Sequence, residues 1–176
     1  MLSLNELSNK TFIKNSCYRI IASQFPPINL FEDVANADEF DALFAIQMLT
    51  NPRIQDEIGM LERVPKEQRL HGVPGCGYVM AAFTHVNPNG SRFSNGDFGV
   101  YYAAEQLSTA LAETIFHKEQ FLAYTNEPPQ EVAMRSLVAR FSADLIDLTP
   151  IHKVNPIYSL TDYSAGQSLG LQIKEL

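Results

Sequence analysis

The stretch from Ser91 to Lys118 constrains the fold of this chain more than any other part of the sequence. It begins with Arg92, reaches the dipeptide Asn95-Gly96, and continues into the apolar and aromatic run Phe98–Ala103. Asn-Gly is typical of a hairpin turn, and an alternating run rich in aromatic residues favours a buried or half-buried strand. The stretch therefore predicts a turn followed by a strand.

The residues after this run predict a helix with an apolar face. Residues at the 3.6-residue period form that face: Leu107, Ala110, Leu111, Thr114 and Ile115. Glu113 lies on its flank, and His117 follows one turn later. The pattern allows Glu113 either at the rim of the core or on an exposed helix surface. A cation, two tyrosines and one carboxylate thus come from three consecutive elements, which suits a site for a charged small molecule.

The bulk composition is that of a soluble globular chain. Its 176 residues are enough for one domain with a sizeable core, and 45% are hydrophobic. The formal net charge of −7 provides no basic surface for a nucleic acid backbone. Residues 1–11 lack an apolar segment of the kind found in a secretion signal, and no apolar run is long enough to span a membrane. We expect a cytoplasmic protein.

The two cysteines and four histidines do not indicate a metal site. Cys17 and Cys76 are too few for a disulfide framework, and small buried side chains in a reducing compartment are the simpler interpretation. The histidines are scattered without the spacing of zinc ligands. Gly75-Cys-Gly77 resembles the start of a dinucleotide fingerprint, but the third glycine is missing and no strand precedes it. A turn with positive φ is the better interpretation.

The other elements follow from local patterns. We expect a strand at Asn15–Ser23, with Arg19 either on a solvent face or in contact with an anion. Residues 29–66 predict a helical insertion, with a cap near Asn36 and a break at Pro52. The run Tyr78–Phe83 predicts a central strand.

The C-terminal third alternates between linker, strand and helix. Residues 127–130 read as a linker, and Val132–Ile146 as a strand region. A polar segment at Asp162 then leads into a final helix. The sequence contains no phosphate loop, no nucleophile elbow and no second carboxylate paired with Glu113.

Several pieces of the chain together resemble the RES-domain family, toxins of bacterial toxin–antitoxin pairs named for an arginine, a glutamate and a serine. The pieces that carry the resemblance are Cys17-Tyr-Arg19-Ile, Gly90-Ser-Arg92-Phe with Gly96, Val100-Tyr-Tyr102-Ala-Ala, Ala112-Glu113-Thr-Ile-Phe-His117 and Asp162-Tyr-Ser164-Ala-Gly-Gln167-Ser-Leu-Gly170. Their order and spacing fit from about residue 15 to the end of the chain. The insertion at about 29–66 resembles that of one branch of the family.

The resemblance implies an α+β fold with an ADP-ribosyltransferase-like split β-sheet that spans residues 1–176 as one domain. It also implies NAD as the substrate, cleavage of the nicotinamide–ribose bond, and no metal. ADP-ribose would pass to water, phosphate or a protein, so the activity would be that of an NAD glycohydrolase, a phosphorylase or an ADP-ribosyltransferase. An antitoxin encoded nearby is the implied partner, and self-association is also conceivable.

The resemblance also implies roles for five residues. Arg19 would hold the diphosphate, Arg92 would line the same cleft, and Tyr102 would frame the nicotinamide–ribose end. Glu113 would stabilise the oxocarbenium-like centre, and Ser164 would complete the pocket. The family pattern continues past the Ser164 helix into a closing strand, so a chain ending at Leu176 predicts an open sheet edge. The alternative function is therefore a catalytically weak RES-fold module that binds an antitoxin or another copy of itself.

Overall fold

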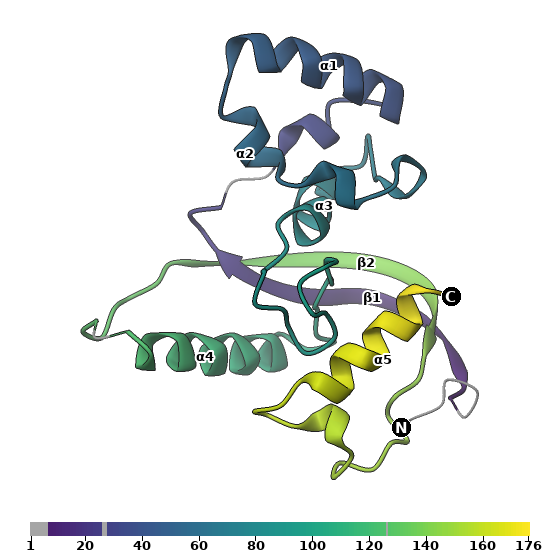
Figure 1. The fold of residues 1–176 in the computed structure, drawn as a ribbon, viewed down its shortest axis with the longest axis vertical. Helices are drawn as coiled ribbons and strands as arrows, with labels where there is room; N and C mark the ends of the chain where they lie inside the picture. The colour runs from purple at the N-terminus through teal and green to yellow at the C-terminus, as the bar shows by residue number, and fades with distance from the viewer. Residues whose placement is uncertain (1–6, 26–27, 126) are drawn as a thin grey trace. The chain divides into compact units, whose positions relative to one another are not determined.

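The computed structural model describes residues 7–25, 28–125 and 127–176, except for the side chains of Lys14 and Asn15. The described residues form an α+β structure of helices and one antiparallel strand pair (Figure 1). They divide into two compact units. The first unit contains residues 28–101 and 149–176, and the second contains residues 7–25 and 102–148.

The second unit is built on two long strands. Strand β1 (Asn9–Ala22) pairs antiparallel with β2 (Met134–Ile146), with an irregularity between Lys14 and Cys17. A further segment joins β1 through an isolated bridge, in which Tyr18 and Ala104 exchange two backbone hydrogen bonds of 2.8 Å. The strands expected at 15–23 and 132–146 are confirmed, and β1 begins six residues earlier than expected. Its many β-branched and aromatic residues favour this extension.

The strand expected at Phe98–Ala103 is wrong, because this segment forms no ladder. The residue that follows it, Ala104, forms an isolated bridge with Tyr18. A side-chain carbon added at Gly99 would lie 2.3 Å from the carbonyl oxygen of Ala82. The backbone at Gly99 therefore packs closely against a neighbouring segment of the first unit, which leaves no room for a strand partner there. The Asn95-Gly96 turn is also not a hairpin turn: Gly96 has a φ of 102°, but the tight turn lies between Ser91 and Ser94.

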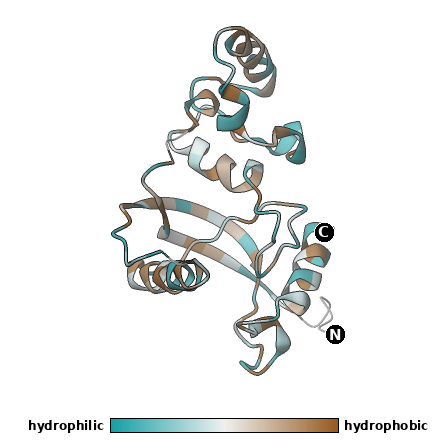
Figure 2. Cartoon of the chain, turned by 60° about the vertical axis from the view of Figure 1, so that its left-hand side comes forward, coloured by the Kyte–Doolittle hydropathy of each residue, from teal (hydrophilic) through white to brown (hydrophobic). Residues whose placement is uncertain are grey.

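Helix α4 (Leu107–Ala123) follows the bridge at Ala104 and packs along β1 (Figure 1). The helix is confirmed, but its expected apolar face is not the buried one. Ala110 is buried, whereas Leu107, Leu111 and Ile115 are 41%, 43% and 55% exposed. Small side chains such as Ala110 allow a helix to approach a strand closely, and this geometry leaves the leucine stripe outside. Figure 2 shows hydrophobic and hydrophilic residues interleaved along α4.

The helical insertion expected at 29–66 is confirmed in the first unit. It contains helices α1 (Ala37–Thr50) and α2 (Ile54–Ile58). A short 3₁₀ turn, Asn29–Phe31, precedes α1, and two more follow α2, Leu61–Arg63 and Lys66–Gln68. The side-chain oxygen of Asn36 accepts hydrogen bonds from the backbone N–H groups of Asp38 and Glu39, as expected for an N-cap. Phe31 and Phe40 belong to a buried apolar cluster, and their rings stack with centroids 4.7 Å apart.

The strand expected at Tyr78–Phe83 is wrong, because these residues belong to helix α3 (Cys76–Thr84). Short apolar runs fit a buried strand and a buried helix equally well by periodicity. Here Cys76, Met80 and Thr84 are buried at helical spacing, and Figure 2 shows mainly hydrophobic residues along α3. The positive φ expected in the glycine-rich turn is confirmed at Gly75, whose φ is 84°.

The final helix, α5 (Ser164–Lys174), begins after a short 3₁₀ turn, η5 (Pro156–Tyr158). Two glycines one turn apart allow α5 to lie directly on the backbone of the 91–94 turn. A side-chain carbon added at Gly166 would lie 2.4 Å from the carbonyl oxygen of Arg92, and one at Gly170 would lie 1.9 Å from that of Phe93. The expected C-terminal helix is confirmed.

The sheet of the described residues has two strands and the added bridge at Ala104. The split sheet of an ADP-ribosyltransferase therefore stays a prediction. Among the helices described, none has both the length and the apolar character that a membrane crossing requires.

Candidate functional site

Arg19 lies in the middle of β1, opposite Leu137 of β2. Its side chain is half-buried, and Nη1 donates a hydrogen bond of 3.1 Å to the carbonyl oxygen of Tyr102. The neighbouring bridge between Tyr18 and Ala104 fixes the same segment against β1. The sequence left open a solvent-facing or an anion-binding Arg19; the observed guanidinium is turned to the segment that carries Tyr102.

Glu113 lies on the exposed side of α4, so the rim of the core is excluded as its position. Its side chain is 70% exposed, and its Oε2 lies 3.6 Å from Nε2 of His117, one turn along the helix. The expected proximity of Glu113 and His117 is confirmed. An exposed carboxylate is accessible from solvent without local rearrangement of α4.

Arg92 belongs to the first unit and organises the segment before α5. Its Nη1 donates hydrogen bonds of 3.2 Å and 2.7 Å to the carbonyl oxygens of Ile157 and Ser159. Its guanidinium carbon lies 4.9 Å from the ring centroid of Tyr163, in cation–π contact. Arg92 thus holds the loop that leads into Ser164.

Ser164 opens α5 and is bound by Asp162. The backbone N–H of Ser164 donates a hydrogen bond of 2.9 Å to Oδ1 of Asp162. This bond, and next the bond from the Ser164 hydroxyl, hold the pKa of Asp162 below its usual value. Asp162 thus binds the backbone of the first residue of α5.

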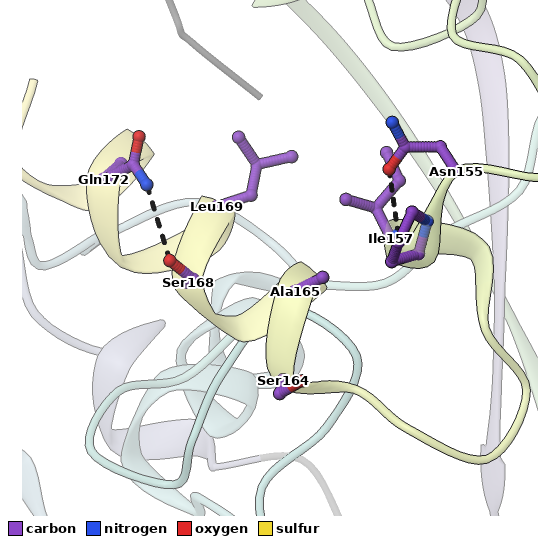
Figure 3. Close-up of a pocket in the computed structure, with 8 residues that line it drawn as sticks. Asn155, Ile157, Ser164, Ala165, Ser168, Leu169 and Gln172 are labelled. Atoms are coloured by element: carbon purple, nitrogen blue, oxygen red, sulfur yellow. Dashed lines mark hydrogen bonds between the residues drawn. The ribbon is translucent and has the colours of Figure 1, made fainter. Parts of the chain in front are cut away.

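A pocket of about 340 Å³ lies in the first unit beside Ser164 (Figure 3). It is lined by residues of two elements, η5 with its cap and α5: Asn155, Pro156, Ile157, Ser164, Ala165, Ser168, Leu169 and Gln172. Figure 3 shows Ala165 on the side of α5 toward Ile157, and Ser168 joined by a hydrogen bond to Gln172.

The structure brings the expected site residues together in two groups. Arg19 and Tyr102 are in contact in the second unit. Glu113 lies on α4, which packs along β1 in the same unit. Arg92 and Ser164 lie in the first unit, linked through Tyr163. Each group combines polar side chains with an aromatic ring.

Sequence reasoning missed Asp162 and the polar lining residues Asn155, Ser168 and Gln172. The signal for Asp162 was present, because Asp before a helix start is a typical cap residue. The spacing of Ser164, Ser168 and Gln172 at four residues also places all three on one stripe of a helix. Neither signal predicts the pocket, because its other wall is η5, whose position relative to α5 does not follow from the sequence pattern.

Nucleophilic thiols and metal clusters do not form part of these groups. Cys17 and Cys76 are buried, and burial raises the pKa of both thiols, which disfavours the reactive thiolate. Within residues 7–25, 28–125 and 127–176, no three His, Cys, Asp or Glu side chains gather as metal ligands would.

Comparison with known proteins gives one family and one relative. The family model described as RES domain matches residues 69–176. The chain is also 35% identical over 137 residues to Uncharacterized protein y4oC of Sinorhizobium fredii (strain NBRC 101917 / NGR234), an alignment covering 77% of this chain and 57% of that protein. The chain thus spans little more than half the length of this relative. No solved structure matches the chain.

Proposed function

The chain belongs to the RES domain family, and we propose that it is an enzyme that consumes NAD by breaking the bond between nicotinamide and ribose. The family is associated with toxin–antitoxin systems and with NAD, which supports a toxin role and an antitoxin partner. The matched region includes Arg92, Tyr102, Glu113 and Ser164, whereas Arg19 precedes it.

The observation that carries the proposal is the contact between Arg19 and the segment of Tyr102. A strand arginine that is half-buried is costly unless it is hydrogen-bonded. The bond to the Tyr102 carbonyl holds the guanidinium at the backbone of a tyrosine that is 40% exposed. Such a pair suits a ligand with a diphosphate next to a flat ring, because a guanidinium binds phosphate oxygens through two parallel hydrogen bonds.

Glu113 supplies the charge that the reaction requires. When the glycosidic C–N bond breaks, its electron pair leaves with neutral nicotinamide, and positive charge develops on the ribose carbon. A carboxylate near the sugar stabilises this charge. The acceptor then forms a new bond at the same carbon and loses its proton to solvent; water, phosphate and a protein side chain are all possible acceptors.

The proposal includes the remaining site residues and the fold. Ser164 would form a hydrogen bond to the ligand from the first turn of α5. Arg92 would act by holding the loop before Ser164 through the carbonyls of Ile157 and Ser159. The β1–β2 pair and the bridge at Ala104 would form part of an ADP-ribosyltransferase-like split sheet.

A second candidate function is favoured by the exposed leucine stripe of α4. Leu107, Leu111 and Ile115 form an apolar face on the helix that carries Glu113. Exposed apolar faces of this kind commonly mark binding surfaces. An antitoxin or a second copy bound there would make the chain a binding module, with or without catalysis.

The test of the proposed function is NAD cleavage by a Glu113→Gln variant. The substitution keeps the size of the side chain and removes its charge, so we expect the rate of nicotinamide release to fall about 100-fold or more. The melting temperature should hardly change, because the side chain is exposed.

Glu119→Gln is the matched control for this experiment. Glu119 is an exposed glutamate of the same helix, and its substitution should leave the rate unchanged. Equal rates for the parent and the Glu113→Gln variant would remove Glu113 from the mechanism. Loss of activity in both variants would point to the charge of α4 as a whole.

A further inference from the structure

Helix α1 has two apolar faces, and one of them belongs to the core of the first unit. Phe40 is fully buried, and Leu43 and Phe44 pack against the same apolar cluster. The opposite face carries four apolar residues spaced three and four apart, as residues on one side of a helix are. We call these residues the outer stripe: Ala42, Ala45, Ile46 and Leu49.

The outer stripe is exposed along its whole length. Ile46 and Leu49 are 61% and 86% exposed, and both alanines are exposed as well. The outward face of a surface helix normally carries polar and charged side chains. Contiguous apolar surface at helical spacing instead marks a surface that another molecule covers.

The sizes of the four side chains fit an antiparallel copy of the same helix. The two small residues come first along α1 and the two large ones follow. About a two-fold axis between positions 45 and 46, Leu49 of each copy faces Ala42 of the other, and Ile46 faces Ala45. Large side chains opposite small ones fill the space between two helices. A parallel pair would place leucine opposite leucine and alanine opposite alanine.

The charges at the two ends of α1 are complementary in the same arrangement. Asp38 is an exposed residue of the first turn, four residues before Ala42 and on the same side of the helix. Arg53 is also exposed, and it follows Asn51, the C-cap of α1. The two-fold axis brings Asp38 of each copy to the end of α1 at which Arg53 of the other copy lies. Opposite charges at both ends favour this orientation over a parallel one.

From these features we infer that the outer stripe of α1 is the interface of a homodimer, in which two copies of α1 pack antiparallel. The occupant is a second copy of this chain, because both the sizes and the charges match under a two-fold rotation, as a self-complementary interface requires. One helix of 14 residues from each chain makes a small interface, so the dimer is weak and reversible. The inference is independent of the proposed NAD cleavage, whose site residues lie outside α1.

Sedimentation equilibrium of the full chain, from micromolar to millimolar concentration, tests the inference. The parent should show a reversible equilibrium between monomer and dimer. Leu49→Ser removes an apolar contact twice in each dimer, so the dissociation constant should rise about 100-fold. Val73→Ser is the matched control, because Val73 is an apolar residue of the same unit that is 56% exposed and lies outside α1. This variant should dimerise as the parent does.

Reversal of the two end charges separates an effect on the interface from an effect on folding. Asp38→Arg and Arg53→Asp each place like charges together at both ends of the helix pair, so each should raise the dissociation constant about tenfold. The double variant exchanges the two charges and should dimerise as the parent does. A loss that arose from a damaged helix would not be restored by the second substitution. Circular dichroism confirms that each variant is folded.

Cross-linking between copies tests the antiparallel orientation. With a rise of about 1.5 Å per residue, the two copies of position 45 are offset by about 1.5 Å along the helix pair, and those of position 42 by about 10 Å. A disulfide joins residues whose Cα atoms lie within about 7 Å. Mild oxidation should therefore link two copies of an Ala45→Cys variant and leave an Ala42→Cys variant monomeric on a denaturing gel. The native Cys17 and Cys76 are buried, which keeps them out of the cross-link.

The inference is overturned if the parent stays monomeric up to millimolar concentration, or if Leu49→Ser dimerises as tightly as the parent. Failure of the charge exchange to restore the dimer would also overturn it. Equal cross-linking at positions 42 and 45 would indicate a parallel pair and contradict the proposed arrangement. Dissociation of the dimer by Leu111→Ser, with Leu49→Ser unaffected, would place the contact between copies on α4 instead.

Discussion

Arg19 shows how one residue can serve both structure and ligand binding. Its guanidinium bonds the Tyr102 carbonyl from the centre of β1, so the side chain is ordered before any ligand arrives. An ordered guanidinium loses less freedom on binding phosphate than an unrestrained one does.

Arg19→Ala should therefore weaken NAD binding more than it slows the chemical step. Hydrogen bonds to charged groups contribute about 1.5–3 kcal/mol, which corresponds to a KM for NAD that is roughly 10–100-fold higher. Steady-state kinetics of nicotinamide release separate KM from kcat.

The control for Arg19→Ala is Arg140→Ala, which removes an exposed arginine from the neighbouring strand β2. Its KM should match that of the parent. An unchanged KM in Arg19→Ala, or an equal increase in both variants, would refute a direct phosphate contact by Arg19.

At the scale of elements, α5 depends on two glycines that let it lie on the 91–94 turn. Gly170→Ala places a carbon 1.9 Å from the carbonyl oxygen of Phe93, so α5 or the turn must move. We expect a loss of stability of about 1–3 kcal/mol, although alanine is the better helix former by about 1 kcal/mol. Thermal unfolding followed by circular dichroism measures the change.

Ser168→Ala is the matched control for α5, because it also introduces alanine and meets no backbone atom. It should leave stability unchanged within about 0.5 kcal/mol. If Gly170→Ala were as stable as this control, close packing of α5 on the turn would not be a feature of the fold.

A second element-scale feature follows the helical insertion in the chain: the half-buried imidazole of His71. Its ring centroid lies 5.5 Å from that of Phe40 and 5.9 Å from that of Phe31. Among the described residues, neither ring nitrogen has a hydrogen-bond partner. Burial, and next the charge of Arg69, lower the pKa of His71, while Asp41 opposes them.

A lowered pKa of His71 in the folded chain makes the stability of the fold pH-dependent. Above the unfolded pKa of about 6.5 the imidazole is neutral in both states, and its contribution to stability is fully present. As the pH falls from about 6.5 through the folded pKa, the unfolded chain binds its proton before the folded chain does. The contribution of His71 to stability is lost over this range.

His71→Phe should reduce the loss of stability between pH 7.5 and pH 5.5, because phenylalanine fits the aromatic cluster and does not titrate. His152→Phe, at an exposed position, should retain the loss seen in the parent. Melting temperatures at the two pH values test this. A parent and a His71→Phe variant with the same pH dependence would contradict the role assigned to His71.

At the scale of the whole molecule, the positions of helices and strands could be predicted from the sequence better than which of their side chains are buried. The Asn36 cap and the helix after Asp162 carry local signals that tertiary packing does not override. The run Tyr78–Phe83 lacks such a signal, since a short apolar run fits a strand or a helix. The buried side of α4 was missed because Ala110 is buried while the larger residues of the expected apolar face are exposed.

The candidate site was predictable in its residue types and only partly in its geometry. A strand arginine, a helix glutamate and a helix-start serine can be found by pattern, and the Glu113–His117 pair follows from helix periodicity. The contacts of Arg19 with Tyr102 and of Arg92 with Ile157 join residues 83 and 65 positions apart. No local rule encodes such contacts, because the fold brings these segments together.

The most direct test of the proposed NAD cleavage is whether the full chain releases free nicotinamide from NAD. We expect one nicotinamide for each NAD consumed, together with ADP-ribose that is free, bound to phosphate or attached to protein, as resolved by mass spectrometry. NAD that stays intact at high enzyme concentration, with the chain folded by circular dichroism, would contradict it.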